Sequence, residues 1–209
     1  MKRVLGITAI VFFFLNLSSV YAQLSLDTGL KVGANLSQID ATNLDETTST
    51  QQLQGYMGGI FVRLTLLGTF AIQPEINYMQ KGGVFVEESG FRTTTLLNYV
   101  EVPVLGKINL FNLLGVIKTS VYGGVAFSKL IEAKTQFEVD DQVVEQDVRE
   151  LYNERDKSYV GGVDLQLDLK AINIILDGRV TLSQDNILVP EMQSVAKNRV
   201  YTLSIGFVF

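Results

Sequence analysis

The stretch Arg199-Val-Tyr-Thr-Leu-Ser-Ile-Gly-Phe-Val-Phe209 decides the fold that we expect for this chain. From Tyr201 onward every second side chain is large and apolar, whereas Thr202, Ser204 and Gly206 between them are polar or small. Alternation with a period of two indicates a strand with one apolar and one polar face. Such a strand suits a β-barrel that turns its apolar face to lipid and its polar face inward.

The same alternation recurs in seven earlier stretches of the chain. The expected strands cover residues 26–36, 55–64, 70–81, 96–109, 116–131, 158–169 and 172–183. The connections alternate between long and short, and the long ones are 37–54, 82–95, 132–157 and 184–198. Bacterial outer-membrane barrels have long external loops and short periplasmic turns. We therefore predict an all-β fold, an eight-stranded antiparallel up-and-down transmembrane β-barrel.

The composition agrees with a barrel and excludes several kinds of catalysis. Hydrophobic residues make up 47% of the chain, with a mean hydropathy of +0.24, yet no internal run approaches the roughly 18 apolar residues of a membrane helix. The chain has no cysteine and no histidine, which excludes disulfides, thiol catalysis, histidine-based triads and His or Cys metal ligands. We expect no enzymatic activity, no catalytic or metal-binding residues and no cofactor.

The first residues have the features of an export signal. Lys2 and Arg3 supply positive charge, residues 4–17 form a short apolar core, and Val20-Tyr-Ala22 provides a cleavage site. The short core followed by this site favours a cleaved signal over a membrane anchor. The predicted organisation is a secretory signal peptide at 1–22 and an outer-membrane barrel domain at 23–209. No basic cluster indicates nucleic-acid binding.

Three stretches resemble the eight-stranded outer-membrane barrels of the Bacteroidetes that are often called PorT-like. Gly29-Leu-Lys-Val-Gly-Ala-Asn-Leu-Ser37 is similar to the first strand of that family, Gln73-Pro-Glu-Ile-Asn-Tyr-Met-Gln-Lys-Gly82 to the third, and Tyr99-Val-Glu-Val-Pro-Val-Leu-Gly-Lys107 to the proline-containing fourth. Phe209 matches the C-terminal aromatic that such barrels present to the outer-membrane assembly machinery. The resemblance implies a barrel of the OmpX/OmpA type in the outer membrane of a Gram-negative bacterium, but no single activity.

The polar faces of the expected strands carry charges of both signs in nearly equal number. The cations are Lys31, Arg63, Lys81, Lys107, Lys118 and Arg179, and the acids are Glu75, Glu101, Asp164, Asp168 and Asp177. They form either a proton or ion path or a charge ladder that fills the lumen. We favour the charge ladder, because eight strands enclose only enough room for side chains. The expected pairs are Arg63 with Glu75, Lys107 with Glu75 or Glu101, and Arg179 with Asp164 or Asp168.

Smaller features add local expectations. A closed barrel has no free edge for a proline, so Pro103 predicts a β-bulge. Glycine pairs ending at Gly59, Gly124 and Gly162 follow a tyrosine and predict space for larger side chains in a narrow lumen. Aromatic residues near strand ends are expected to form the two interfacial girdles. They are Tyr56, Tyr78, Tyr99, Tyr159, Tyr201, Phe70 and Phe209.

Acidic side chains gather in the long connection at 132–157. The stretch from Glu138 to Asp156 lacks the spacing of an EF-hand, so we expect a solvated surface with a helical turn within 146–155 rather than a metal site. Asp140 and Asp141 are adjacent, and on an extended strand they would point to opposite faces, which argues against joint catalysis.

The function that we expect is a membrane-anchored structural or interaction scaffold with long extracellular loops and a side-chain-filled lumen. Its partners would be outer-membrane lipids, the assembly machinery through Phe209, and an extracellular or envelope protein bound by the loops at 37–54 and 132–157; we expect a monomer. One alternative is a narrow pore or small-solute transporter. Another is a secreted lipocalin-like barrel that binds a lipophile, because alternation alone does not say which face points inward.

Overall fold

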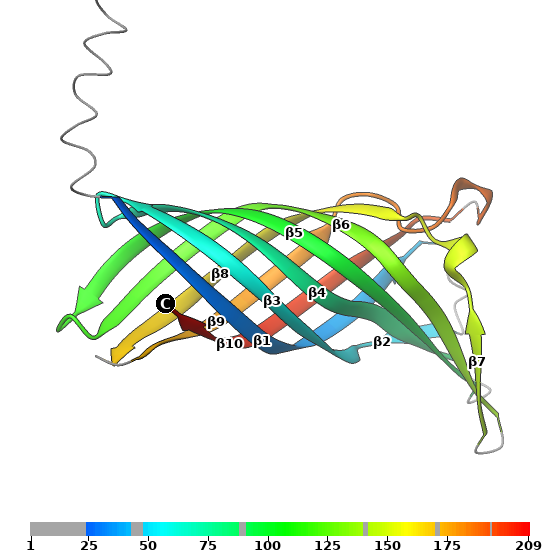
Figure 1. Ribbon diagram of the computed structural model, residues 1–209. Coiled ribbons are helices and arrows are strands. Elements are labelled where there is room, and N and C mark those ends of the chain that lie inside the picture. The colour runs from blue at the N-terminus through cyan, green and yellow to red at the C-terminus, as the bar shows by residue number, and fades with distance from the viewer. Residues whose placement is uncertain (1–23, 43–47, 88–90, 140–141, 170–171, 193) are drawn as a thin grey trace, which may run out of the picture.

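A computed structural model describes residues 24–42, 48–87, 91–139, 142–169, 172–192 and 194–209. Eight long antiparallel strands form a closed, tilted ring (Figure 1). They are β1 (Leu24–Ala41), β3 (Leu53–Leu66), β4 (Phe70–Glu87), β5 (Arg92–Leu113), β6 (Ile117–Val139), β8 (Arg155–Leu169), β9 (Ile172–Ser183) and β10 (Ala196–Val208). Two short strands, β2 (Thr48–Gln51) and β7 (Gln142–Asp147), and two 3-10 helices, η3 (Arg149–Leu151) and η4 (Pro190–Met192), complete the described elements. Within these ranges no helix is long and apolar enough to cross a membrane.

Each ring strand pairs with the next one along the chain, and β10 closes the ring by pairing with both β1 and β9. The β1–β10 register runs from Gly29 opposite Val208 to Ala41 opposite Ala196. The backbones of Thr28 and Phe209 extend this seam by two mutual hydrogen bonds of 3.1 and 2.8 Å. The predicted up-and-down barrel is confirmed, and the stretch from Arg199 to Phe209 belongs to the strand that closes it.

The barrel is apolar outside and polar inside. Leu26 and Leu203 on the outer face are 66% and 70% exposed, whereas Lys81 and Glu101 on the inner face are fully buried. A lipocalin-type barrel needs the opposite arrangement, with its apolar face around the ligand. That alternative is therefore wrong, and the outer surface is suited to lipid.

The two ends of the barrel differ. At the turn end, which also holds the first and last described residues, β3–β4 and β5–β6 are joined by Leu-Leu-Gly turns. Their central residues all have positive φ, 54° and 66° at Leu67 and Gly68 and 55° and 71° at Leu114 and Gly115. This is the type I′ geometry that matches the twist of a tight hairpin. The predicted third turn, at 170–171, lies outside the described residues.

At the opposite loop end, the strands run much farther than predicted. Most of the expected loops at 82–95 and 132–157 is strand, because β4, β5 and β6 continue beyond the band of exposed apolar residues. In the expected loop at 37–54, β1 continues to Ala41, β2 pairs with β4, and β3 begins at Leu53. In β4 the four consecutive residues Lys81 to Val84 are all buried, so the alternation that identifies a membrane strand disappears. The helical turn expected within 146–155 is reduced to the three residues of η3.

The expected bulge at Pro103 is wrong. Pro103 pairs in register with Ala126, and the β5–β6 register shifts instead at Asn98/Tyr99 and near Asn109. On its other side, the β4–β5 pairing stops at Pro74 opposite Val104 and resumes three residues later. Pro74 and Pro103 lack a donor N–H, and both lie at this interruption of the β4–β5 pairing.

Glycine makes room for larger side chains at two of the three predicted pairs, whereas a methyl group at position 124 would overlap the backbone of Val104. A methyl group at position 162 would overlap the hydroxyl and ring of Tyr122, which lies opposite on β6. A methyl group at position 59 would similarly overlap the side-chain amide of Asn77. Larger side chains on neighbouring strands thus require glycine at position 59 of β3 and at position 162 of β8.

Six of the seven aromatic residues expected in the girdles lie on the outer face of the barrel. Tyr56 is 55% exposed and stacks on Tyr78, with 5.8 Å between the ring centroids. The other outward-facing members are Phe70, Tyr159, Tyr201 and Phe209. Tyr99 is fully buried in the lumen, because it shares the inward face of β5 with Glu101.

Candidate functional site

The lumen is organised around Glu75 on β4. Its carboxylate accepts hydrogen bonds from Lys31 Nζ at 2.8 Å and from Arg179 Nη1 and Nη2 at 2.8 and 3.0 Å. Gln73 Nε2 and Asn77 Nδ2 donate to it from the same strand, at 2.8 and 2.9 Å. Arg179 Nη2 also lies 3.6 Å from an Asp177 carboxylate oxygen. One carboxylate therefore connects β1, β4 and β9 across the barrel.

A second group of charges lies nearer the loop end. Lys81 Nζ contacts Glu101 Oε2 at 2.7 Å and lies 3.8 Å from Asp156 Oδ2. The Lys81 ammonium also lies 4.9 Å from the centre of the Tyr99 ring, a cation–π distance. Asp156 is 2% exposed and accepts a hydrogen bond from the hydroxyl of Ser183. Its assignment to the solvated acidic loop is wrong, because β8 begins at Arg155 and turns this carboxylate inward.

The predicted partners of the inward charges are wrong, although every one of these charges lies on the inner face. Lys107 pairs with Asp164, and Lys118 pairs with Asp168 at 2.6 Å. Arg63 bonds to two glutamine oxygens rather than to Glu75. The prediction considered mainly neighbouring strands, whereas long side chains in a narrow lumen reach strands on the far side.

The buried charges of the described lumen balance, and little space is left between them. Five cations and five acids are buried: Lys31, Arg63, Lys81, Lys107 and Arg179, with Glu75, Glu101, Asp156, Asp164 and Asp177. The cavity at mid-barrel, between Phe61 and Ile175, has a volume of about 10 Å³. This is about the space for a single water molecule. The favoured interpretation of a filled, locked lumen agrees with this geometry.

The loop end of the lumen is closed by apolar side chains. Leu97, Leu130 and Ile187 are fully buried there against Tyr99 and Ile39. Ile187 comes from the β9–β10 connection, which folds across the mouth. Sequence reasoning missed this closure, and the one available signal is the apolar stretch 187–189 within a connection that is otherwise largely polar.

Asparagine side chains hold this closing connection in place. Asn186 Oδ1 accepts hydrogen bonds from the backbone N–H groups of Leu188 and Ala196, at 3.1 and 2.9 Å. Asn153 Nδ2 donates to the carbonyl oxygens of Asn186 and Leu188, both at 2.8 Å. The backbone of an irregular segment is thereby satisfied although it lies over a buried apolar cluster.

Outside the membrane-spanning part, one charged cluster ties β6 to β7. Lys134 Nζ contacts carboxylate oxygens of Glu145 and Glu132 at 2.8 and 2.9 Å. The hydrogen bonds to Glu145 and Glu132 raise the pKa of Lys134. The hydrogen bond from Lys134 in turn lowers the pKa of each of the two carboxyl groups. The cluster is exposed, so it orients the hairpin rather than forming a buried site.

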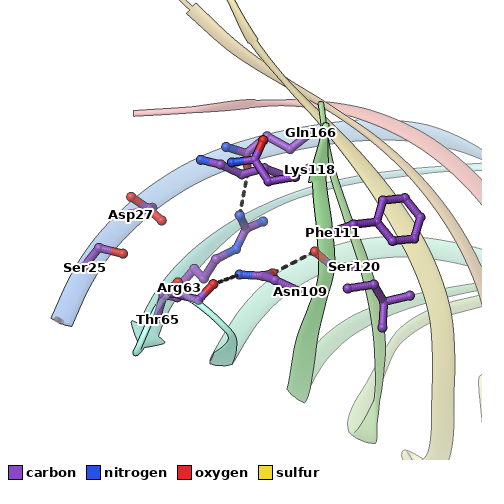
Figure 2. A pocket seen from close by; sticks show the side chains of 12 residues that line it. Ser25, Asp27, Arg63, Thr65, Asn109, Phe111, Lys118, Ser120 and Gln166 are labelled. Carbon is purple, nitrogen blue, oxygen red and sulfur yellow. Dashed lines mark hydrogen bonds between the residues drawn. The ribbon is translucent and has the colours of Figure 1, made fainter. Parts of the chain in front are cut away.

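The turn end holds a polar cavity of about 400 Å³ (Figure 2). Its wall includes Arg63 and Lys118, and its rim includes the exposed residues Leu110 and Phe111. Asn109 Nδ2 donates to the Gly68 carbonyl oxygen at 2.8 Å, and the Ser120 hydroxyl donates to Asn109 Oδ1 at 2.9 Å. These bonds hold part of the polar wall in place.

No group of three or more acidic side chains that could hold a metal ion is present in the described ranges. The expected absence of catalytic, cofactor-binding and metal-binding residues stays a prediction. Asp140 and Asp141 lie outside the described residues, and so does the predicted signal peptide at 1–22.

An all-strand ring with a lipid-compatible outer face and a charged, filled interior defines a transmembrane β-barrel. The chain belongs to the family described as outer membrane protein beta-barrel domain, which it matches over residues 21–188. Its location is accordingly the outer membrane. The family consists mostly of non-enzymatic proteins.

Several solved structures are similar to this chain over most of their length. Neisserial surface protein A is 8% identical with a TM-score of 0.51, over 87% of this chain and 95% of that one. OprG from Pseudomonas aeruginosa is 9% identical with a TM-score of 0.50, over 90% and 97%. Ail from Yersinia pestis is 14% identical with a TM-score of 0.45, over 88% and 98%. At such low identities the likeness to the first two shows the fold alone. No curated protein sequence matches the chain.

Proposed function

We propose that this protein is a membrane-anchored scaffold that presents its loop end for interaction and carries out no catalysis. The observation that carries the proposal is the filled lumen. A cavity of about 10 Å³ at mid-barrel admits no solute, and the buried ion pairs of Lys31 and Lys107 beside it hold the side chains in place. The apolar cluster around Ile187 closes the loop end as well.

The surface proposed for a partner is the loop end, in the segments 37–54 and 132–157. β7 and the adjoining part of β6 form a hairpin that extends beyond the barrel rim (Figure 1). Val143 and Val144 on this hairpin are 63% and 55% exposed. Exposed apolar side chains on a structured projection support an extracellular or envelope protein partner. The apolar outer band would contact outer-membrane lipids, and the barrel would act as a monomer.

The competing candidate is a narrow pore or small-solute transporter, which the polar lumen favours. Planar-bilayer recording of the refolded barrel separates the two. A scaffold predicts no discrete conductance steps, and a control barrel of known conductance in the same bilayers verifies that steps are detectable. Reproducible steps that depend on insertion of this protein would overturn the scaffold proposal.

The proposal also includes a Gram-negative origin, export by the signal peptide at 1–22, and membership of the PorT-like barrels of the Bacteroidetes. Phe209, which is 71% exposed on the outer surface, would bind the assembly machinery. Deletion of Phe209 is expected to reduce the folded fraction in the outer membrane while export continues. The heat-shifted band on a gel of membrane fractions measures that fraction, and normal insertion of the deletion variant would remove the assembly role.

A further inference from the structure

Arg63 differs from the other buried cations of the lumen in having no carboxylate partner. It is 7% exposed, and it donates from Nε to Gln73 Oε1 at 2.8 Å and from Nη1 to Gln166 Oε1 at 2.7 Å. Nη2 is buried and has no hydrogen-bond acceptor among the described residues. The other four buried cations each contact a carboxylate. A buried guanidinium bonded only to neutral oxygens favours an additional negative charge beside it.

Arg63 lines the turn-end cavity, where a second cation lies nearby. Lys118 Nζ contacts an Asp168 carboxylate oxygen at 2.6 Å, and its side chain is 40% exposed. Gln166 links the two cations, because it accepts from Arg63 and donates to Asp168 Oδ1 at 2.6 Å. Figure 2 shows Arg63, Lys118 and Gln166 gathered on one side of the cavity. The wall therefore carries two cations at the turn end, of which Lys118 is paired with Asp168 whereas Arg63 has no carboxylate partner.

One acidic side chain on the cavity wall is a possible internal partner for Arg63. Asp27 lies directly opposite Arg63 in the β1–β3 register, but the two side chains form no ion pair. Arg63 extends instead toward Gln166, away from the β1 edge (Figure 2). Asp168 is engaged by Lys118 and Gln166. The guanidinium edge thus stays without a protein carboxylate.

We propose that the turn-end cavity is a binding site for a small organic oxyanion, held by Arg63 and Lys118. The two cations would contact a carboxylate or phosphate group, because the planar guanidinium matches these groups and Lys supplies a second point charge. The cavity volume of about 400 Å³ is that of a small-molecule site. Leu110 and Phe111 at the rim would cover the apolar part of the ligand. The site does not depend on the scaffold proposal, since a ligand enters and leaves by the turn end.

The test uses the full barrel refolded in detergent micelles, with sodium benzoate and sodium phosphate as probes at constant ionic strength. Benzoate carries a carboxylate on an apolar ring, and phosphate lacks the ring. Comparing the two probes therefore shows whether the site binds a carboxylate with an apolar part or a phosphate group. A saturable change in the ¹H–¹⁵N signal of Arg63 Nε with at least one probe is expected. Sodium chloride at equal ionic strength gives the baseline. Absence of a saturable change with both probes would overturn the proposal.

Calorimetric affinities of variants assign the contacts. Arg63→Gln is expected to weaken binding at least about tenfold, because it removes a charge-assisted contact. Asp27→Asn removes the acidic side chain opposite and is expected to tighten binding several-fold. Arg199→Gln, an exposed arginine at the loop end, is the matched control and leaves the affinity unchanged.

Variants at the rim keep the test decisive if Arg63→Gln does not fold. Lys118→Gln lies at a partly exposed position, so the barrel tolerates the change, and it is expected to weaken binding several-fold. An affinity that is the same in Lys118→Gln and in the unmodified barrel contradicts the proposed site. Equal binding by Arg63→Gln, where it folds, contradicts it too.

Discussion

Replacement of Glu75 by glutamine tests whether the lumen charges hold the barrel together. The substitution keeps the shape of the side chain, but it removes the negative charge and replaces one acceptor oxygen by an amide NH2 group, which cannot accept the hydrogen bonds made to that oxygen. Lys31 and Arg179 would stay buried, at 4% and 3% exposed. Arg179 would keep Asp177, with 3.6 Å between Nη2 and the carboxylate, whereas Lys31 would lose its carboxylate partner.

The expected cost follows from the number of cations left without a partner. Removing one member of a buried ion pair costs about 3–5 kcal/mol. Glu75→Gln affects two cations, so we expect a loss near the upper value, about 5 kcal/mol. In Glu101→Gln, Lys81 keeps a single carboxylate partner, Asp156, at 3.8 Å. We therefore expect a smaller loss in the free energy of unfolding, about 3 kcal/mol. A change at the exposed Glu138 should stay within about 0.5 kcal/mol.

Urea titration of the barrel in lipid vesicles measures these differences. The chain has no tryptophan, so far-UV circular dichroism is the suitable signal, with the heat-shifted gel band as a second measure of folded protein. The free energy of unfolding should be highest for Glu138→Gln, lower for Glu101→Gln and lowest for Glu75→Gln. The slope of this free energy against urea concentration should be the same for all three variants. If Glu75→Gln is as stable as Glu138→Gln, the charges are solvated and the ion pairs do not lock the lumen.

Three further changes test local features. Gly162→Ala forces a methyl group into Tyr122 and should cost about 1–3 kcal/mol in urea titration, whereas Gly161→Ala, whose added methyl has no neighbour closer than 3.9 Å, serves as the control. Leu114→Asn should raise stability by about 1 kcal/mol, because asparagine tolerates the positive φ of 55° better than leucine; an unchanged urea midpoint would argue against strain at this turn. The carboxylates bound to Lys134 have lowered pKa values, so their contribution is present above the ordinary glutamate pKa and lost as pH falls through the lowered one. Hydrogen exchange of the β6–β7 hairpin, corrected for the intrinsic rate, should therefore accelerate on acidification, and pH-independent protection would contradict the ion-pair account.

The eight barrel strands and the two faces of each were predictable because the membrane imposes a repeating constraint on each strand. Within the apolar band each outward position must be apolar and each inward position polar or small, so alternation places side chains such as Leu203 and Ser204 on opposite faces. Beyond the band the constraint ends. The continuation of β4 to Glu87 and of β6 to Val139 gave no such signal, and these segments were assigned to loops.

The pairing of the lumen charges could not be read from the sequence, because it depends on ring closure. Glu75 on β4 meets Lys31 on β1 and Arg179 on β9, and neither strand is a neighbour of β4 in the ring. Which strands face each other across a narrow barrel follows from the stagger of all eight registers together. A sequence pattern predicts which face of a strand each residue lies on. It does not predict which residue on another strand will be its ion-pair partner across the lumen.

The two ends of the lumen also decide how a solute reaches the interior. At the loop end β1, β5, β6 and β10 each contribute to a buried apolar cluster, and Ile187 packs within it. At the turn end the inward positions carry Arg63, Lys118 and hydroxyl or amide groups around the larger cavity. A charged solute would have to displace a buried apolar cluster to enter from the loop end, whereas at the turn end it meets a cavity whose inner wall is polar and whose rim includes Leu110 and Phe111. Among the described residues, the lumen is therefore open at the turn end and closed at the loop end, which is the end that we propose for a partner.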